Sequence, residues 1–114
     1  MSVEPVTVTT GPDDTVTIRP LGDLSAEHAV GLRGTLVHAV RRLRPSRLVV
    51  DLRAVSHLDS ISLGTVAAAC HLGDDHHVAV FIENPSATIA SQLTAAGVAA
   101  HRLRNAAAGA VPPG

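Results

Sequence analysis

Aromatic side chains are almost absent from this sequence of 114 residues, which contains one phenylalanine, Phe81, and neither tyrosine nor tryptophan. Any hydrophobic core must therefore be aliphatic, and a hydrophobic content of 46% is enough to build one. The shortage also argues against binding of single-stranded nucleic acid, because such proteins stack bases on aromatic rings. With a formal net charge of −1, the chain has no electrostatic attraction for nucleic acid or for an anionic membrane.

Cysteine and long apolar runs are scarce as well. Cys70 is the single cysteine, so there is no disulfide framework, and its alanine neighbours indicate a buried thiol. No stretch approaches the roughly 20 apolar residues of a membrane span, and the N-terminus lacks the charged and then apolar order of a signal peptide. We therefore expect one cytoplasmic domain, followed by a disordered tail at residues 105–114.

The first part of the chain alternates apolar and polar residues in two short segments, 5–10 and 15–19. This alternation is typical of half-buried strands, and the turn residues "GPDD" between the segments predict a hairpin. The side chains expected to face inward are Val6, Val8, Val16 and Ile18.

A helix is expected next, between Ser25, a good N-cap, and Pro45, which cannot continue a helix. Apolar residues recur there at helical spacing, which predicts an inward face formed by Ala29, Leu32, Leu36, Val40 and Leu43.

The rest of the chain alternates buried strands with helices. The apolar run at 47–53 predicts a strand buried on both faces. A helix from Ser60 to Gly73, a strand at 77–83, a helix at 84–97 that ends at Gly97 and a short strand at 98–104 follow. The order β-β-α-β-α-β-α-β predicts an α/β domain with a partly parallel sheet.

Chemically interesting side chains gather in the stretch "HLDSISLGT" at residues 57–65. It follows a predicted buried strand, and functional groups of α/β sheets collect beyond the carboxyl ends of strands. The "GDLS" segment follows another strand, so Asp23 and Asp59 are expected on the same edge of the sheet.

An enzymatic site is not expected in this stretch. His57, Asp59 and Ser60 are too close in sequence for the geometry of a catalytic triad, and no G-x-S-x-G motif is present. The "HLGDDHH" segment at 71–77 offers metal-ligand types, but an exposed turn is the commoner explanation. It also lies about 13 helical residues, on the order of 20 Å, from Ser60. No nucleotide-loop or H-E-x-x-H motif suggests a cofactor.

Two interpretations of the serines remain open from the residues alone. Ser60 and Ser62 fall in the first turn of a predicted helix, where free backbone N–H groups and the helix dipole favour a phosphate. Phosphorylation there would add about −1.5 to −2 charges beside Asp59 and repel an acidic partner. Alternatively, Asp59 or Ser60 simply caps the helix.

The segment "LVVDLRAVSHLDSISLGTV" resembles the central signature of STAS domains, particularly those of bacterial anti-sigma factor antagonists. That signature is an apolar strand ending in Asp-Leu, a short loop, and Asp-Ser-Ser-Gly-Leu-Gly at a helix start. "GDLS" is similar to the family's Gly-Glu-Leu-Asp segment, and "HVAVFIENPSATIASQLTAAGV" to its later strand, turn and helix. The resemblance covers about residues 3 to 104 and implies a STAS domain at residues 1–104, with a mixed sheet of about five strands.

The resemblance implies a regulator without enzymatic activity or cofactor. Its partner would be an anti-sigma factor, often a serine-protein kinase, which the unphosphorylated antagonist captures and the phosphorylated one releases. The implied partner-binding residues are Asp23, Asp59, Ser60, Ile61, Ser62, Leu63 and Gly64.

One departure from the family pattern concerns the phosphorylated residue. In an ungapped alignment Asp59, Ser60, Leu63 and Gly64 match the signature, but the phosphoacceptor position holds Ile61. We therefore expect no phosphoserine switch there, with Ser60 and Ser62 as weaker candidates. Alternative functions are a sensor that binds a nucleotide or small anion at the same edge, and a component of a stress-signalling assembly.

Overall fold

The computed structural model of the chain describes residues 6–23 and 26–105, with residues 26 and 27 described by their backbone only. Within these residues, five strands form one sheet in the order β1-β2-β3-β4-β5. The elements are β1 (Val6–Thr10), β2 (Thr15–Pro20), α1 (Ala26–His38) with a π-helical turn (Ala39–Leu43), β3 (Arg47–Asp51), α2 (Ser60–Asp75), β4 (Ala79–Glu83), α3 (Ala87–Ala95), a 3₁₀ turn (Ala100–Arg102) and β5 (Leu103–Arg104).

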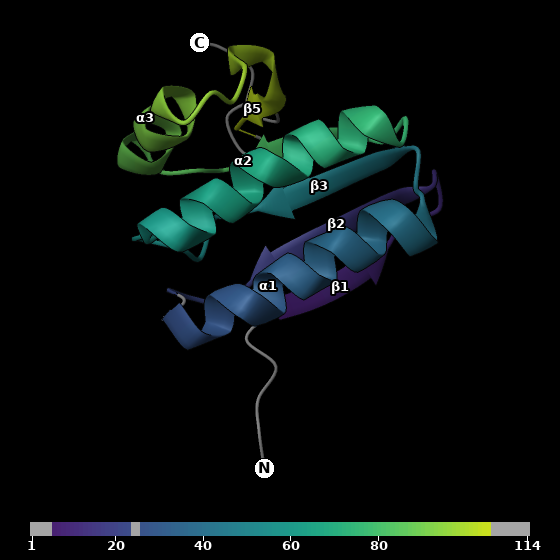
Figure 1. Cartoon of the computed structure of the whole chain (residues 1–114), viewed down its shortest axis with the longest axis horizontal. Coiled ribbons are helices and arrows are strands. Elements are labelled where there is room, and N and C mark those ends of the chain that lie inside the picture. Colours follow the sequence, from purple (N-terminus) through teal and green to yellow (C-terminus); the bar gives the residue numbers. More distant parts are fainter. Residues whose placement is uncertain (1–5, 24–25, 106–114) are drawn as a thin grey trace, which may run out of the picture.

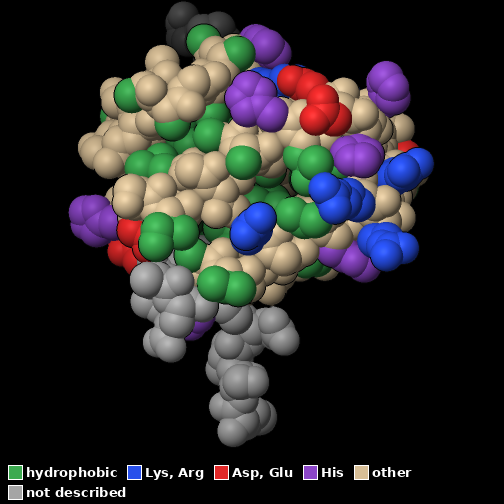
Figure 2. Space-filling model, in the orientation of Figure 1, with side chains coloured by type: hydrophobic (Ala, Val, Ile, Leu, Met, Phe, Trp, Pro, Cys, Tyr) green, Lys and Arg blue, Asp and Glu red, His purple; other side chains and the backbone are tan. Residues whose placement is uncertain are grey.

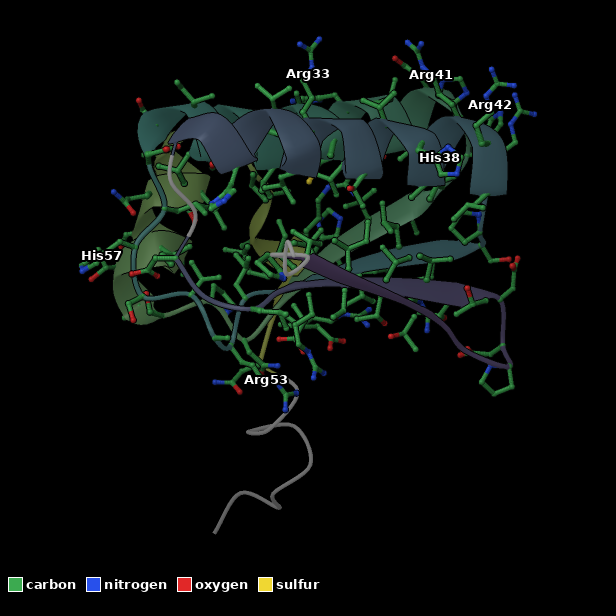
Figure 3. All side chains as sticks on the ribbon, turned by 90° about the horizontal axis from the view of Figure 1, so that it is seen from below. Arg33, His38, Arg41, Arg42, Arg53 and His57 are labelled. Carbon is green, nitrogen blue, oxygen red and sulfur yellow. The ribbon has the colours of Figure 1, made fainter. Side chains whose placement is uncertain are left out.

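The strand directions confirm the predicted mixed α/β sheet. β1 and β2 form an antiparallel hairpin, whereas β2, β3, β4 and β5 run parallel to one another. α1 and α2 lie side by side on one face of the sheet, and α3 lies beside α2 near β5 (Figure 1). Figure 3 shows this layering from the edge, with α1 and α2 on one side of the sheet. Because β2 and β3 are parallel, α1 and α2 both start at the same end of the sheet.

The aliphatic core lies between the helix layer and the sheet, as the shortage of aromatic residues requires. Its largest fully buried side chains come from strands and from helices, and include Ile18, Leu48, Val50, Val80 and Ile82 from the sheet and Leu32, Leu36, Val40, Val66 and Ile89 from the helices. The prediction for Val8 is correct for the face of the sheet, which it shares with Ile18, but Val8 is 49% exposed instead of buried. Val8 is paired with Ile18, but it lies on the edge strand, where helix cover ends.

The end of the first helix also differs from the prediction. Leu43 was expected on the inward stripe, but its side chain is 46% exposed. The chain widens into a π-helical turn before Pro45, and the Arg44 N–H donates to the Ala39 carbonyl at 2.9 Å, five residues back. A wider turn changes the angle between successive side chains, so Leu43 leaves the stripe that Leu36 and Val40 follow. The predicted cap, Ser25, lies outside the described residues.

Gly73 does not end the second helix, which continues two residues further to Asp75. A Cβ atom at Gly73 would come within 2.5 Å of Val80 Cγ2 and 2.6 Å of the Val78 carbonyl oxygen. The glycine is therefore required because α2 passes very close to β4. Gly97, by contrast, has φ of +100° and follows α3 as predicted.

The last predicted strand, 98–104, is mostly wrong. Val98 N–H donates to the Leu93 carbonyl at 3.0 Å, which completes the end of α3. A 3₁₀ turn then precedes β5, which contains only two residues. Residues 106–114 of the predicted tail lie outside the described residues. Among the described helices, none has the length and apolar character needed to cross a membrane.

Candidate partner-binding site

The rim is the surface at the carboxyl ends of β2 and β3, formed by residues 21–23 and 56–64. Asp23 connects its two segments, because its Oδ1 accepts hydrogen bonds from the Ser56 N–H at 2.6 Å and the His57 N–H at 3.0 Å. These bonds, the one from His57 most strongly, lower the pKa of the Asp23 carboxyl. The expectation that Asp23 shares an edge with the start of α2 is therefore confirmed.

Asp59 is the N-cap of α2. Its backbone is extended, with φ of −71° and ψ of 169°, and its Oδ1 accepts a hydrogen bond from the Ser62 N–H at 2.7 Å. This bond satisfies one of the free N–H groups of the first helical turn. Of the two cap candidates left open by the sequence, Asp59 therefore has the role, and the hydroxyl of Ser60 does not.

The three residues after the cap point in different directions. Ser60 is exposed, and Ile61 is 59% exposed. Ser62, in contrast, is 0% exposed, and its Oγ has no hydrogen-bond partner among the described residues. Leu63 is half-buried against the core, and Gly64 is exposed.

The burial of Ser62 argues against two of its predicted roles. A kinase or a partner could reach this hydroxyl only if the first turn of α2 opened. Ser60 and Ile61 remain accessible at the surface, together with Asp23. Leu21, 49% exposed, adds a second aliphatic side chain on the same rim.

A buried acid behind the rim was missed by the sequence reasoning. Asp51, the last residue of β3, has a side chain that is 2% exposed. It accepts hydrogen bonds from Arg19 Nε at 3.1 Å, the Arg53 N–H at 3.1 Å and Asn84 Nδ2 at 3.2 Å, and both arginines form ion pairs with it. Burial alone would raise the pKa of Asp51, but the hydrogen bonds from Arg53 and Asn84 and the charges of the arginines outweigh it and lower the pKa.

This network fixes the ends of β2, β3 and β4 relative to one another. It thereby holds the loop that leads from β3 to the rim. The available signal was a carboxylate directly after the apolar residues of "RLVVD", because a carboxylate in such a place is rarely buried without partners. The partners could not be named from the sequence, because Arg19 and Asn84 are 32 and 33 residues away.

The enzymatic and metal candidates do not form sites within the part of the chain that the structure describes. No hydrogen bond joins the His57 imidazole to Ser60 there, and no three His, Cys, Asp or Glu side chains are placed to hold a metal ion. In the "HLGDDHH" segment, Asp74 instead accepts two hydrogen bonds from Arg102, at 2.7 and 2.8 Å.

The electrostatics of the rim also disfavour a small anion as its ligand. Asp23 and Asp59 place two carboxylates there, and Asp59 already occupies the Ser62 N–H that an anion at a helix start would use. The surface is better suited to a partner that covers Ile61 and Leu21 and presents hydrogen-bond donors or cations toward the carboxylates.

Comparison with known proteins identifies a family over nearly the whole chain. Residues 6–104 match the family model of the STAS domain. No curated protein matches the sequence directly.

Solved structures share the fold at low sequence identity. The anti-sigma factor antagonist SpoIIAA in its unphosphorylated form matches with a TM-score of 0.69 and 19% identity, over 78% of this chain and 81% of its own. A variant of RsbS from Moorella thermoacetica gives 0.71 and 15%, over 88% and 84%. The STAS domain of a SulP transporter from Vibrio cholerae gives 0.61 and 17%, over 83% and 76%. The same fold thus occurs in regulators and in a transporter domain.

Proposed function

Because this chain belongs to the STAS domain family, we propose that it is a protein-binding regulator that captures an anti-sigma factor and so controls the availability of a sigma factor. The observation that carries the proposal is the exposed Ile61 on the first turn of α2, beside the ordered carboxylates of Asp23 and Asp59. An apolar contact at the rim suits a protein partner and offers no group for catalysis. The likeness to SpoIIAA and RsbS supports the choice of partner class.

Ile61 is expected to be the main apolar contact. Full burial of an isoleucine side chain stabilises a complex by roughly 1.5–3 kcal/mol, and more than half of this side chain is available for burial. Its removal should therefore weaken capture by about 1–2 kcal/mol, or roughly 5- to 30-fold in Kd.

The usual phosphoserine switch is absent in this proposal. The resemblance assigns the acceptor position to Ile61, which has no hydroxyl, and the neighbouring Ser62 hydroxyl is buried. Capture would then be constitutive unless Ser60, the exposed hydroxyl beside it, accepts the phosphate.

The capture test uses the tagged full chain in its native host, with quantitative mass spectrometry of the co-purified proteins. An anti-sigma factor or serine-kinase-like protein should be enriched with the wild type and lost with Ile61→Asp. Val8→Asp is the matched control, because it also places a charge on an exposed aliphatic residue but lies on the edge strand away from the rim. Enrichment of no such protein, or equal enrichment with Ile61→Asp, would reject the proposed function.

The regulation test uses the captured kinase, ATP and intact-mass measurement. We expect no added phosphate on the wild type, and one phosphate on Ile61→Ser, in which the exposed position gains a hydroxyl. Phosphorylation of the wild type that disappears with Ser60→Ala would assign the switch to Ser60 and overturn the constitutive form of the proposal.

A further inference from the structure

A groove of about 640 Å³ runs between α1 and α2 on the side that faces away from the sheet. Its α1 wall is a stripe of residues three or four positions apart, Val30, Arg33, Val37 and Arg41. Its α2 wall follows the same spacing from Ile61 through Ala68 and Leu72 to Asp75. Figure 2 shows hydrophobic side chains along the helix layer, with arginines toward one end. One end of the groove is the rim, because Ile61 belongs to both.

Small residues keep this groove open. Ala68 is exposed on α2, and a Cβ atom built on Gly64 would contact nothing within 4 Å. Larger side chains at these positions would fill the space between two parallel helices. The groove is also apolar where it meets the rim, since Val30 is 76% exposed and Ile61 is 59% exposed. Two such aliphatic side chains in one groove mark a surface that an apolar partner could cover.

The charges along the groove are unequal. Arg33 and Arg41 lie on the α1 wall, and neither guanidinium has a carboxylate partner among the described side chains. Figure 3 shows both pointing away from the sheet into solvent. Asp75 is the acid that lines the opposite wall, at the far end of α2. The groove therefore complements an occupant with an apolar side and an acidic flank toward α1.

We propose that this groove binds an acidic amphipathic helix of a partner protein. The α2 wall runs over 15 residues from Ile61 to Asp75, a distance of roughly 21 Å, which fits a helix of three to four turns. Apolar residues at i, i+4 and i+7 of that helix would lie over Val30 and Ala68. Acidic residues seven or eight positions apart would face Arg33 and Arg41. The proposal goes beyond capture at the rim and holds whichever protein the rim binds.

A second copy of this chain is a poorer occupant. α3 contains no acidic residue, and the acids of α2 are confined to its last two positions. α1 has one acidic residue, at its second position. None of the three α-helices therefore presents acidic residues seven or eight positions apart along an apolar side. The complementary helix must therefore come from a different protein.

The test measures binding of two synthetic 16-residue peptides to the ¹⁵N-labelled full chain by NMR titration. Both peptides carry the same leucine stripe, and one has glutamates while the other has lysines along the flank. The glutamate peptide should shift the amides of the groove walls saturably and bind at least tenfold more tightly than the lysine peptide. Raising NaCl from about 50 mM to about 300 mM should weaken its binding, because exposed charge pairs are screened. The double variant Arg33→Glu, Arg41→Glu should reverse the preference between the peptides.

A second pair of variants separates shape from charge. Ala68→Phe fills the groove and should lower the affinity for the glutamate peptide at least fivefold. Ala95→Phe adds the same side chain to an exposed position on α3 and should leave the affinity unchanged. Thermal unfolding of each variant checks that the fold is retained.

Several results would overturn the proposal. These are absence of saturable shifts at the groove, equal affinity for the two peptides, or no effect of Ala68→Phe. Sedimentation that shows a dimer disrupted by Ala68→Phe would assign the groove to a second copy instead. Binding to phosphatidylglycerol vesicles without peptide binding, lost in the arginine double variant, would assign it to a membrane surface. Because the probe is synthetic and Ala68 lies away from the rim, failure here leaves the capture experiment at Ile61 unaffected.

Discussion

Replacing Ser62 with alanine is expected to stabilise the chain, although Ser62 belongs to the segment that resembles the family signature. Its side chain is fully buried, and its Oγ has no hydrogen-bond partner among the described residues. The Asp59 cap is bonded to the backbone N–H of Ser62, so the substitution leaves that bond in place.

The magnitude follows from three contributions. A buried hydroxyl without a partner costs about 1–3 kcal/mol. Alanine at a helical position adds up to about 0.5 kcal/mol relative to serine. Loss of the packing contacts of one oxygen atom opposes these gains by up to about 1 kcal/mol. The net expectation is an increase of about 1 kcal/mol in the free energy of unfolding, or roughly 4 °C in Tm for a domain of this size.

The assay is urea unfolding at neutral pH, followed by far-UV circular dichroism, with Ser60→Ala as the matched control. Ser60 lies two residues earlier and is exposed, so its variant should stay within about 0.5 kcal/mol of the wild type. A loss of more than about 0.5 kcal/mol in Ser62→Ala, with an unchanged m-value, would refute the reasoning. It would mean that the hydroxyl has a partner, such as a buried water molecule.

Three further predictions concern the elements that position the rim and α2. Asp59→Ala should lower the free energy of unfolding by about 1 kcal/mol, whereas Asp59→Asn should stay near the wild type, because an amide oxygen can also cap the helix. Urea midpoints distinguish the two variants, and equal losses of stability would show that the cap is not what Asp59 contributes. Gly73→Ala should destabilise the chain by about 2 kcal/mol or more, because its Cβ would collide with Val80. Gly64→Ala has open space around it and should raise the free energy of unfolding by up to about 1 kcal/mol. A stabilised Gly73→Ala would contradict the close approach of α2 to β4. Because the pKa of Asp51 is lowered, its contribution to stability is present above its ordinary pKa, near 4, and is lost as the pH falls through the lowered value. Asp51→Asn should therefore flatten the pH dependence of the urea midpoint between about pH 5 and pH 2. An unchanged slope would count against the network.

Most of the fold could be predicted from the sequence, because local patterns determine its elements. The hairpin follows from alternation on either side of "GPDD", and β3 follows from one continuous apolar run. The errors arise where packing overrides local pattern. A glycine at position 73 is typical of a helix end, but this one is required because α2 passes so close to β4 that a Cβ atom would not fit. No local sequence pattern encodes that distance. Leu43 keeps helical spacing in the sequence, and only the π-helical turn moves it to the surface.

The candidate site could be predicted in part. Strand direction was enough to place Asp23 and Asp59 on one edge, because parallel strands end together. The Asp51 network could not be predicted, since two of its partners, Arg19 in β2 and Asn84 directly after β4, are distant in the chain. The groove between α1 and α2 was missed as well. Its signal was the row of small residues in α2, which indicates buried packing as readily as an open surface.

The direction in which each residue of the first turn of α2 points determines which hydroxyl a kinase can reach. Successive helical residues point about 100° apart, and the Asp59 cap fixes where the rotation starts. Ser62 therefore shares the inward stripe with Val66, four residues later, while Ile61 lies on the outward stripe with Ala68. A hydroxyl is accessible to a kinase on the second stripe and not on the first. Burial therefore argues against Ser62 as an acceptor, whereas the exposed Ser60 is the hydroxyl that the regulation test addresses. In our proposal the outward position has a different role: Ile61 is exposed and lines the groove, so it would extend the surface that a partner covers.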